Sequence, residues 1–466
     1  MKVSMNPDLR SVMLSPALPS AIFLFGLTFC LAIAHFTGLA WQQHDTVVLY
    51  ASLFVWVLVI AWRRRDAINR LGAIDVLFSM FVITIMAGVV MPHGEIYDSI
   101  IKSMYYLPFM VLAPYLCGRM MISQDVGFLS QIMVGLGLAV LPLLLIEFLI
   151  SPGPLAGRWM FFGLNHGSLL VGCILAIALT SLCEYLIAHQ NDEKQGDLSR
   201  LVCYGLIGIF TITLVWVRAR GWLVGGLVGV AVVTFLAENW KFSSRLGLFF
   251  YVVIIAGISL AVMPRADARF YAQILIAPKL LFPNSMSPVS VSSPSRSPVS
   301  VSSPSTSPVS VIQSKPILGK ASCSYLEAGV NSIMIRSVLY QEAAAIFMEK
   351  PLFGMGSARF GEKSCVGVGG FPHSTILQSF AELGLLGGGL LLGVFSVALI
   401  ALGRRNFSKF RGEKGCKVRF VLALLTVFLI VDQVYGNYFV MVGTCLMLGI
   451  TARMQVMSKK DFAVHK

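Results

Sequence analysis

Residues 375–402 read TILQSFAELGLLGGGLLLGVFSVALIAL, and this stretch decides the fold. It is apolar over a length that crosses a hydrocarbon core of roughly 30 Å as a helix. Similar runs recur along the chain, whose 466 residues are 56% hydrophobic and only 12% charged. Soluble domains carry roughly 25% charged residues. We therefore expect an all-α, polytopic integral membrane protein.

The positions of the basic residues orient the expected spans. The formal net charge is +14, and the basic residues gather in short segments between apolar runs, such as 63–70 and 404–419. This is the positive-inside pattern of cytoplasmic loops, so it argues against nucleic acid as a partner and puts both termini in the cytoplasm. About twelve spans are expected, at 18–40, 47–62, 74–91, 104–116, 126–150, 164–186, 201–217, 221–236, 246–262, 375–402, 418–434 and 438–450.

The same pattern divides the chain into three regions. Residues 1–262 form an N-terminal bundle of membrane helices, 263–372 a large loop on the outer side, and 373–466 the C-terminal membrane helices. Within the loop, residues 284–314 carry a serine–proline repeat with a ten-residue period. Serine and proline cannot bury a core, so we expect this repeat to be disordered.

Residues 331–350 of the loop are expected to form an amphipathic helix. Ile335, Leu339 and Ala343 share one face at helical spacing, whereas Arg336 and Glu342 are polar. The helix would lie over the membrane helices, either as part of a site or as a structural lid.

Several outer residues could carry chemistry. Arg158 and the pair Arg218 and Arg220 break the positive-inside bias, so they either snorkel to lipid phosphates or bind an anion. Arg220 precedes a helix-opening glycine, whose helix would offer its N-terminal amides to that anion. His373, before the span at 375–402, is either a general base or a structural hydrogen-bonding residue. His166 lies near Arg158 in sequence.

Other chemistries have no matching pattern. The chain has no P-loop, no nucleophile elbow and no metal-ligand spacing around His373, so we expect no metal and no cofactor. Cys323 and Cys365 both lie in the outer loop and could form a disulfide there.

A longer constellation has a specific likeness. The run PLFGMG at 351–356 is followed by His373, by Leu377 and Gln378, and by ELGLLG at 382–387. Together these elements resemble the signature of the O-antigen ligase and polymerase superfamily, a family of bacterial membrane proteins. The segment RARG at 218–221 resembles that family's serine-arginine-glycine element, and Arg336 resembles its second arginine. The chain departs from the pattern in having Ser374 where asparagine is common, and Ala219 in place of the serine.

The resemblance implies a multi-pass protein of the bacterial inner membrane with its active site facing the periplasm. Its activity would be transfer of a glycan from an undecaprenyl-diphosphate carrier to a sugar hydroxyl, without metal or nucleotide. In a ligase, the favoured reading, the acceptor is lipid A–core, and in a polymerase it is another lipid-linked glycan. His373 would be the general base. The diphosphate would be held by Arg220, Arg336 and Arg218, and possible supporting residues are Arg158, His166 and Glu382.

Two other classes of function stay open on the sequence alone. A transporter or flippase of lipid-linked glycans would be expected to have ionisable residues in the middle of its spans and an internal helical repeat. A structural scaffold would leave the run from PLFG to ELGLLG unexplained. Membrane lipids are expected partners in every case, and no pattern indicates an oligomeric state.

Overall fold

The computed structural model describes residues 15–25, 43–90, 106–150, 167–189, 197–237, 240–262, 332–365, 370–407, 413–438 and 441–457. The serine–proline repeat, Arg158, His166 and Cys323 lie outside these residues, so the expectations for them stay predictions.

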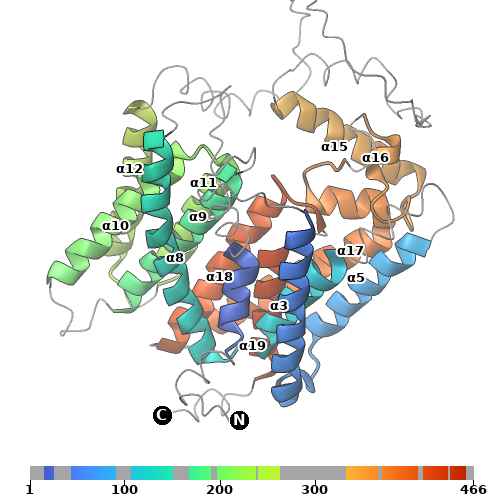
Figure 1. Ribbon diagram of the computed structural model, residues 1–466, viewed down its shortest axis with the longest axis horizontal. Helices are drawn as coiled ribbons and strands as arrows, with labels where there is room; N and C mark the ends of the chain where they lie inside the picture. The colour runs from blue at the N-terminus through green and yellow to red at the C-terminus, as the bar shows by residue number, and fades with distance from the viewer. Residues whose placement is uncertain are drawn as a thin grey trace, which may run out of the picture.

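All regular structure in the described ranges is helical (Figure 1), which confirms the all-α prediction. The helices are α3 (Gln43–Arg63), α4 (Arg65–Ile68), α5 (Ala73–Val90), the π-helical turn η1 (Leu107–Leu112), α7 (Ala113–Met120), α8 (Ser123–Ile150), α9 (Gly167–Ala188), α10 (Asp197–Trp216), α11 (Arg220–Phe235), α12 (Phe242–Val262), α15 (Ser332–Glu349), α16 (Phe360–Lys363), α17 (Thr375–Phe407), α18 (Glu413–Asp432) and α19 (Val442–Val456).

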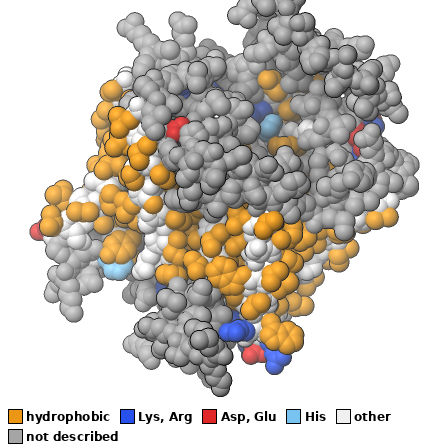
Figure 2. Space-filling model, in the orientation of Figure 1, with side chains coloured by type: hydrophobic (Ala, Val, Ile, Leu, Met, Phe, Trp, Pro, Cys, Tyr) orange, Lys and Arg blue, Asp and Glu red, His pale blue; other side chains and the backbone are white. Residues whose placement is uncertain are grey.

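Six of these helices are long and apolar enough to cross a membrane, namely α5, α8, α9, α10, α12 and α17. Shorter apolar helices coincide with further expected spans, among them α11 and α19. Large apolar side chains cover much of the visible outside of the bundle (Figure 2). Ile83, Leu145 and Ile254 are among those that are exposed. Such a surface suits lipid rather than water, so the protein is a multi-pass membrane protein.

The interior of the bundle is built around α9, α18 and α19. Helix α9 packs against α8, α10, α11 and α18. Of the residues in its most apolar stretch, 89% are buried inside the protein. Helix α19 packs against α7, where Gly118 and Gly449 let the two backbones approach closely. Small residues at such crossings allow van der Waals packing between helices in lipid.

The span at 375–402 is not continuous, contrary to the sequence expectation. Helix α17 breaks at Gly384, which has φ 65° and ψ −162°. The carbonyls freed by the break accept hydrogen bonds from the 351–356 segment: Met355 N to Ala381 O at 3.2 Å and Gly356 N to Glu382 O at 2.8 Å. In return, the N–H of Leu385 donates to Pro351 O at 2.7 Å. The PLFGMG and ELGLLG motifs therefore complete each other's backbone hydrogen bonds.

The amphipathic helix expected at 331–350 is present as α15. Its apolar face, with Leu339, Ala343 and Ile346 fully buried, packs against the first part of α17 (Figure 1). Glu342, expected on the polar face, is instead buried. Its carboxylate accepts hydrogen bonds from the Ser364 hydroxyl at 2.6 Å and from the N–H of Cys365 at 3.0 Å. This contact ties α15 to the segment that precedes His373.

Candidate functional site

The end of the bundle covered by α15, called here the α15 end, carries most of the residues singled out in the sequence. Helices α11 and α17 begin there and α18 ends there. A short turn at 432–436, which follows α18, contacts α11, α15 and α17.

Arg220 is the first residue of α11 and is half-buried, and Arg218 is buried in the turn before it. Arg218 has φ 60°, a left-handed conformation that is uncommon for a residue with a side chain. Ala219 packs against Gly172 of α9, where an added Cβ would lie 2.5 Å from the alanine methyl group. The turn is thus fixed by close packing, and it holds both arginines at the start of α11.

Tyr435 joins the start of α11 to α15. Its hydroxyl accepts a hydrogen bond from the N–H of Gly221 at 3.1 Å. A Cβ on Gly221 would come within 3.0 Å of Cδ2 of this ring and closer still to Cε2, so only glycine fits after Arg220. On α15, the Arg336 guanidinium lies 5.5 Å from the centre of the same ring, in a cation–π contact. Arg336 and the residue that follows Arg220 therefore contact one aromatic side chain.

Gln433 joins α15 to the start of α17. Its side-chain oxygen accepts hydrogen bonds from the Ser374 hydroxyl at 2.9 Å and from the N–H of Ile376 at 3.4 Å. Its backbone carbonyl accepts a hydrogen bond from the Tyr340 hydroxyl at 3.3 Å. Burial raises the pKa of Tyr340, and the charge of Arg336 acts in the opposite direction. The Tyr340 hydroxyl is thus protonated at neutral pH, as that of an ordinary tyrosine is, and it can donate.

His373 sits immediately before this junction. It is half-buried, its ring lies edge-on to Phe371 with centroids 4.7 Å apart, and its φ is 57°. Ser374 caps α17, because its hydroxyl accepts a hydrogen bond from the N–H of Leu377 at 3.3 Å. A non-glycine residue with positive φ is a strained position that surrounding contacts must hold, and such positions cluster at functional sites.

Among the described residues predicted from sequence, four lie close to one turn and Glu382 lies apart from them. The four, His373, Arg336, Arg220 and Arg218, lie on elements that meet at the 432–436 turn. Glu382 is not among them. Its Oε2 accepts hydrogen bonds from the N–H of Ala358 at 2.8 Å and from the Tyr438 hydroxyl. Glu382 thus anchors the segment after PLFGMG to α17.

The Glu382 carboxylate also holds the chain on both sides of Arg359, a residue that the sequence did not single out. Oε1 of Glu382 accepts a hydrogen bond from the N–H of Phe360 at 2.9 Å, so both neighbours of Arg359 are held. Arg359 is 1% exposed, and none of its three side-chain nitrogens has a hydrogen-bond partner among the described residues. The nearest carboxylate oxygen, on Glu362, lies 3.8 Å from its Nε. A buried guanidinium with unused donors is costly, and an anionic partner would satisfy it.

Gln433 and Tyr435 were also missed. They occupy a short polar segment between two apolar spans, and polarity at that boundary was the only available signal. Within the described residues, no group of three or more histidine, cysteine or acidic side chains is placed to hold a metal ion.

Fold and site together define a multi-pass helical membrane protein with histidine and arginine residues gathered at one end. Residues 205–392 match the family model described as O-antigen ligase. This match over part of the chain confirms the resemblance to the O-antigen ligase superfamily. The matched part runs from α10 into α17 and includes His373, Arg336 and Arg220, but it ends before the 432–436 turn. No curated protein and no solved structure gave a significant match to the chain.

Proposed function

We propose that the protein transfers a glycan from an undecaprenyl-diphosphate carrier to a sugar hydroxyl, at the periplasmic face of the bacterial inner membrane. The observation that carries the proposal is the 432–436 turn. It contacts the start of α11, the cationic part of α15 and the residue after His373. The proposed reaction needs a base and anion-binding cations close together, and the turn joins the elements that bear them.

In the proposed reaction, the acceptor hydroxyl attacks the anomeric carbon of the donor glycan. A new bond forms between the acceptor oxygen and this carbon, and the bond from the carbon to the diphosphate oxygen breaks. The imidazole of His373 takes the hydroxyl proton. Negative charge grows on the departing diphosphate, and the guanidinium groups of Arg220 and Arg336 stabilise it as bidentate donors. Direct displacement of this kind inverts the anomeric configuration.

The contacts of Glu382 bear on the transporter alternative. A buried carboxylate inside a long membrane helix is a usual mark of an ion pathway. Glu382 instead accepts four hydrogen bonds, from the N–H groups of Ala358 and Phe360 and from the side chains of Tyr438 and Gln378. A structural anchor for the PLFGMG segment accounts for this residue without transport.

The test is a complementation series in a strain that lacks the gene. His373→Ala should abolish glycan transfer while protein level and export of the carrier-linked glycan stay normal. Arg220→Lys and Arg336→Lys should each lower transfer, because an ammonium cannot make the paired donor contacts of a guanidinium. Arg245→Lys is the matched control, since Arg245 binds the carbonyls of Trp240 and Phe235 at the opposite end of the bundle. Normal transfer by His373→Ala would refute the proposal.

Within this proposal we favour ligase over polymerase, and the two differ in the lipopolysaccharide pattern of the deletion strain. A ligase transfers finished chains to lipid A–core, so its loss removes all capped species. A polymerase lengthens chains before transfer, so its loss leaves lipid A–core capped by single repeat units.

A further inference from the structure

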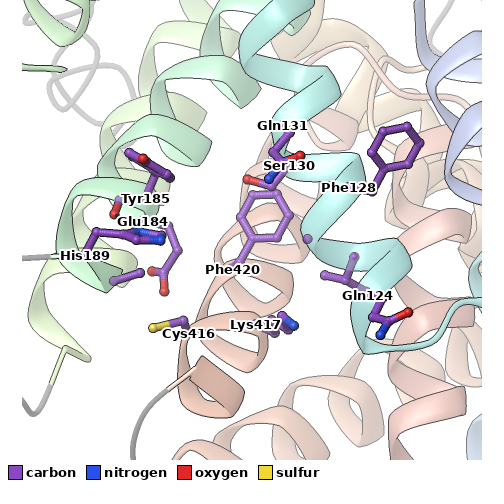
Figure 3. Close-up of a pocket in the computed structure, with 13 residues that line it drawn as sticks. Gln124, Phe128, Ser130, Gln131, Glu184, Tyr185, His189, Cys416, Lys417 and Phe420 are labelled. Carbon is purple, nitrogen blue, oxygen red and sulfur yellow. Dashed lines mark hydrogen bonds between the residues drawn. The ribbon is translucent and has the colours of Figure 1, made fainter. Parts of the chain in front are cut away.

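A pocket of about 410 Å³ opens at the end of the bundle opposite the α15 end, between α8, α9 and α18 (Figure 3). It lies beside Cys416 and Lys417, near the start of α18. Gln433 follows the end of the same helix, about 24 Å away at a rise of roughly 1.5 Å per residue. The pocket is therefore separate from the candidate active site.

One wall of the pocket presents acceptor atoms. Glu184 of α9 is 5% exposed, and its Oε1 accepts a hydrogen bond from Arg419 Nη2 at 3.2 Å. Its Oε2 makes no hydrogen bond of ordinary geometry to the described residues, and the carboxylate points toward the Cys416 thiol at the edge of the pocket (Figure 3). A thiol is only a weak donor, so this buried carboxylate oxygen is suited to a ligand that brings a stronger one.

His189 adds a second acceptor to the wall. Its Nδ1 lies 3.0 Å from the carbonyl oxygen of Tyr185, and its ring stacks on the Tyr185 ring with centroids 4.3 Å apart. A carbonyl oxygen can only accept, so Nδ1 carries the hydrogen. In the neutral imidazole, Nε2 is then left as an acceptor.

The opposite wall presents donors. Lys417 and Gln124 lie across the pocket from Glu184 and His189, and Gln131 lies above them (Figure 3). An ammonium and two amide groups are ordinary contacts for phosphate oxygens. Phe420 lies between the two walls and gives the pocket an apolar surface (Figure 3).

The depth of the pocket in the bundle matches that of lipid head groups. It is formed where two membrane-crossing helices end, near the first residues of α8 and the last residues of α9. The hydrocarbon region of a bilayer stops at this level and its polar layer begins. A volume of this size also falls within the range of roughly 300–1,000 Å³ typical of small-molecule pockets.

We propose that this pocket binds the phosphoethanolamine head group of a membrane phospholipid. The primary ammonium donates hydrogen bonds to Glu184 Oε2 and His189 Nε2. The phosphate accepts from Lys417 and the glutamine amides, and the glycerol lies against Phe420. A head group that has no N–H donors, or no ammonium, cannot donate hydrogen bonds to Glu184 and His189.

The test measures lipid retention by the purified full-length protein, using native mass spectrometry in detergent. Phosphatidylethanolamine, phosphatidylcholine and phosphatidylglycerol with the same acyl chains are offered at equal concentration. The wild-type protein should retain phosphatidylethanolamine at least about tenfold better than the other two, as expected for a charge-assisted hydrogen bond. Equal retention of all three lipids would overturn the proposal.

Variants of the pocket residues then test whether the preference for phosphatidylethanolamine arises in this pocket. Glu184→Gln removes the negative charge, and His189→Phe keeps a ring on Tyr185 but removes its nitrogens. Each should lose most of the preference, and Lys241→Ala, which lies outside the pocket, should keep it. His189→Phe also leaves the Glu184–Arg419 pair intact, so it remains informative if Glu184→Gln does not fold. An unchanged preference in His189→Phe would refute this pocket, and equal competition by free phosphoethanolamine would refute the lipid as the ligand.

Discussion

Replacing Gly384 with alanine should show whether the break in α17 is needed for stability and for glycan transfer. Gly384 has φ 65° and ψ −162°, a region populated almost only by glycine. An added Cβ would press on the Leu352 carbonyl group and lie 2.5 Å from the Phe353 nitrogen. Both neighbours are backbone atoms, so the PLFGMG segment must move away from α17. Gly389 of the same helix is the matched control, because its added Cβ meets no atom within 4 Å.

The cost of Gly384→Ala follows from two contributions. The strained backbone contributes roughly 1–3 kcal/mol. Moving the segment also breaks its hydrogen bonds to α17, namely Met355 N to Ala381 O, Gly356 N to Glu382 O, Leu385 N to Pro351 O and Leu386 N to Leu352 O. At roughly 0.5–1.5 kcal/mol each, they add about 2–6 kcal/mol. By contrast, Gly389→Ala should stabilise the helix by roughly 0.5–1 kcal/mol.

The assay is thermal unfolding of the purified protein in detergent, combined with glycan transfer in membranes. Gly384→Ala should unfold at a clearly lower temperature and lose transfer, because α17 carries His373 at its start. Gly389→Ala should unfold at the wild-type temperature or above and keep transfer. If both variants unfolded at the wild-type temperature, the backbone pairing between the two motifs would not be needed for stability.

Three further predictions concern single side chains. Arg359→Met should keep or raise the unfolding temperature, because a buried charge with unused donors is removed, while transfer falls; a lower unfolding temperature would make Arg359 structural instead. Tyr435→Phe should keep most of the transfer rate, whereas Tyr435→Leu should lower it, since only the second loses the cation–π contact; equal kcat/KM values for the two would contradict this. Cys365 is disulfide-bonded, and we expect Cys323 as its partner; peptide mapping without reductant would disprove this by linking Cys365 to Cys30.

The helices were predictable because the length of an apolar run is a local property of the sequence. The break in α17 was not, because Gly384 is one of four glycines in GLLGGG and only its contact with Leu352 distinguishes it. Likewise, the pattern of α15 correctly gave its apolar face. It could not show that Glu342 is buried, since Ser364 and Cys365 come from a distant segment.

The candidate site was predictable to a similar extent. Arginines in segments expected on the outer side and a histidine before a span are visible in the sequence, and the resemblance to the family marks the same positions. Gln433 and Tyr435 contact these elements over long sequence separations and lie beyond the matched domain. No local pattern indicates that one short turn joins three such elements, so only the tertiary structure could identify it.

The length of the interior helices has a consequence for the surrounding bilayer. Helices α11 and α19, with 16 and 15 residues and mostly buried side chains, are only about 24 and 22 Å long. Helix α12, which packs against α11, has 21 residues and reaches about 32 Å. The hydrocarbon layer is roughly 30 Å thick, so at least one end of each short helix is submerged below the lipid carbonyls. If that submerged end is the start of α11, a donor could reach Arg220 with its prenyl tail still dissolved among the acyl chains.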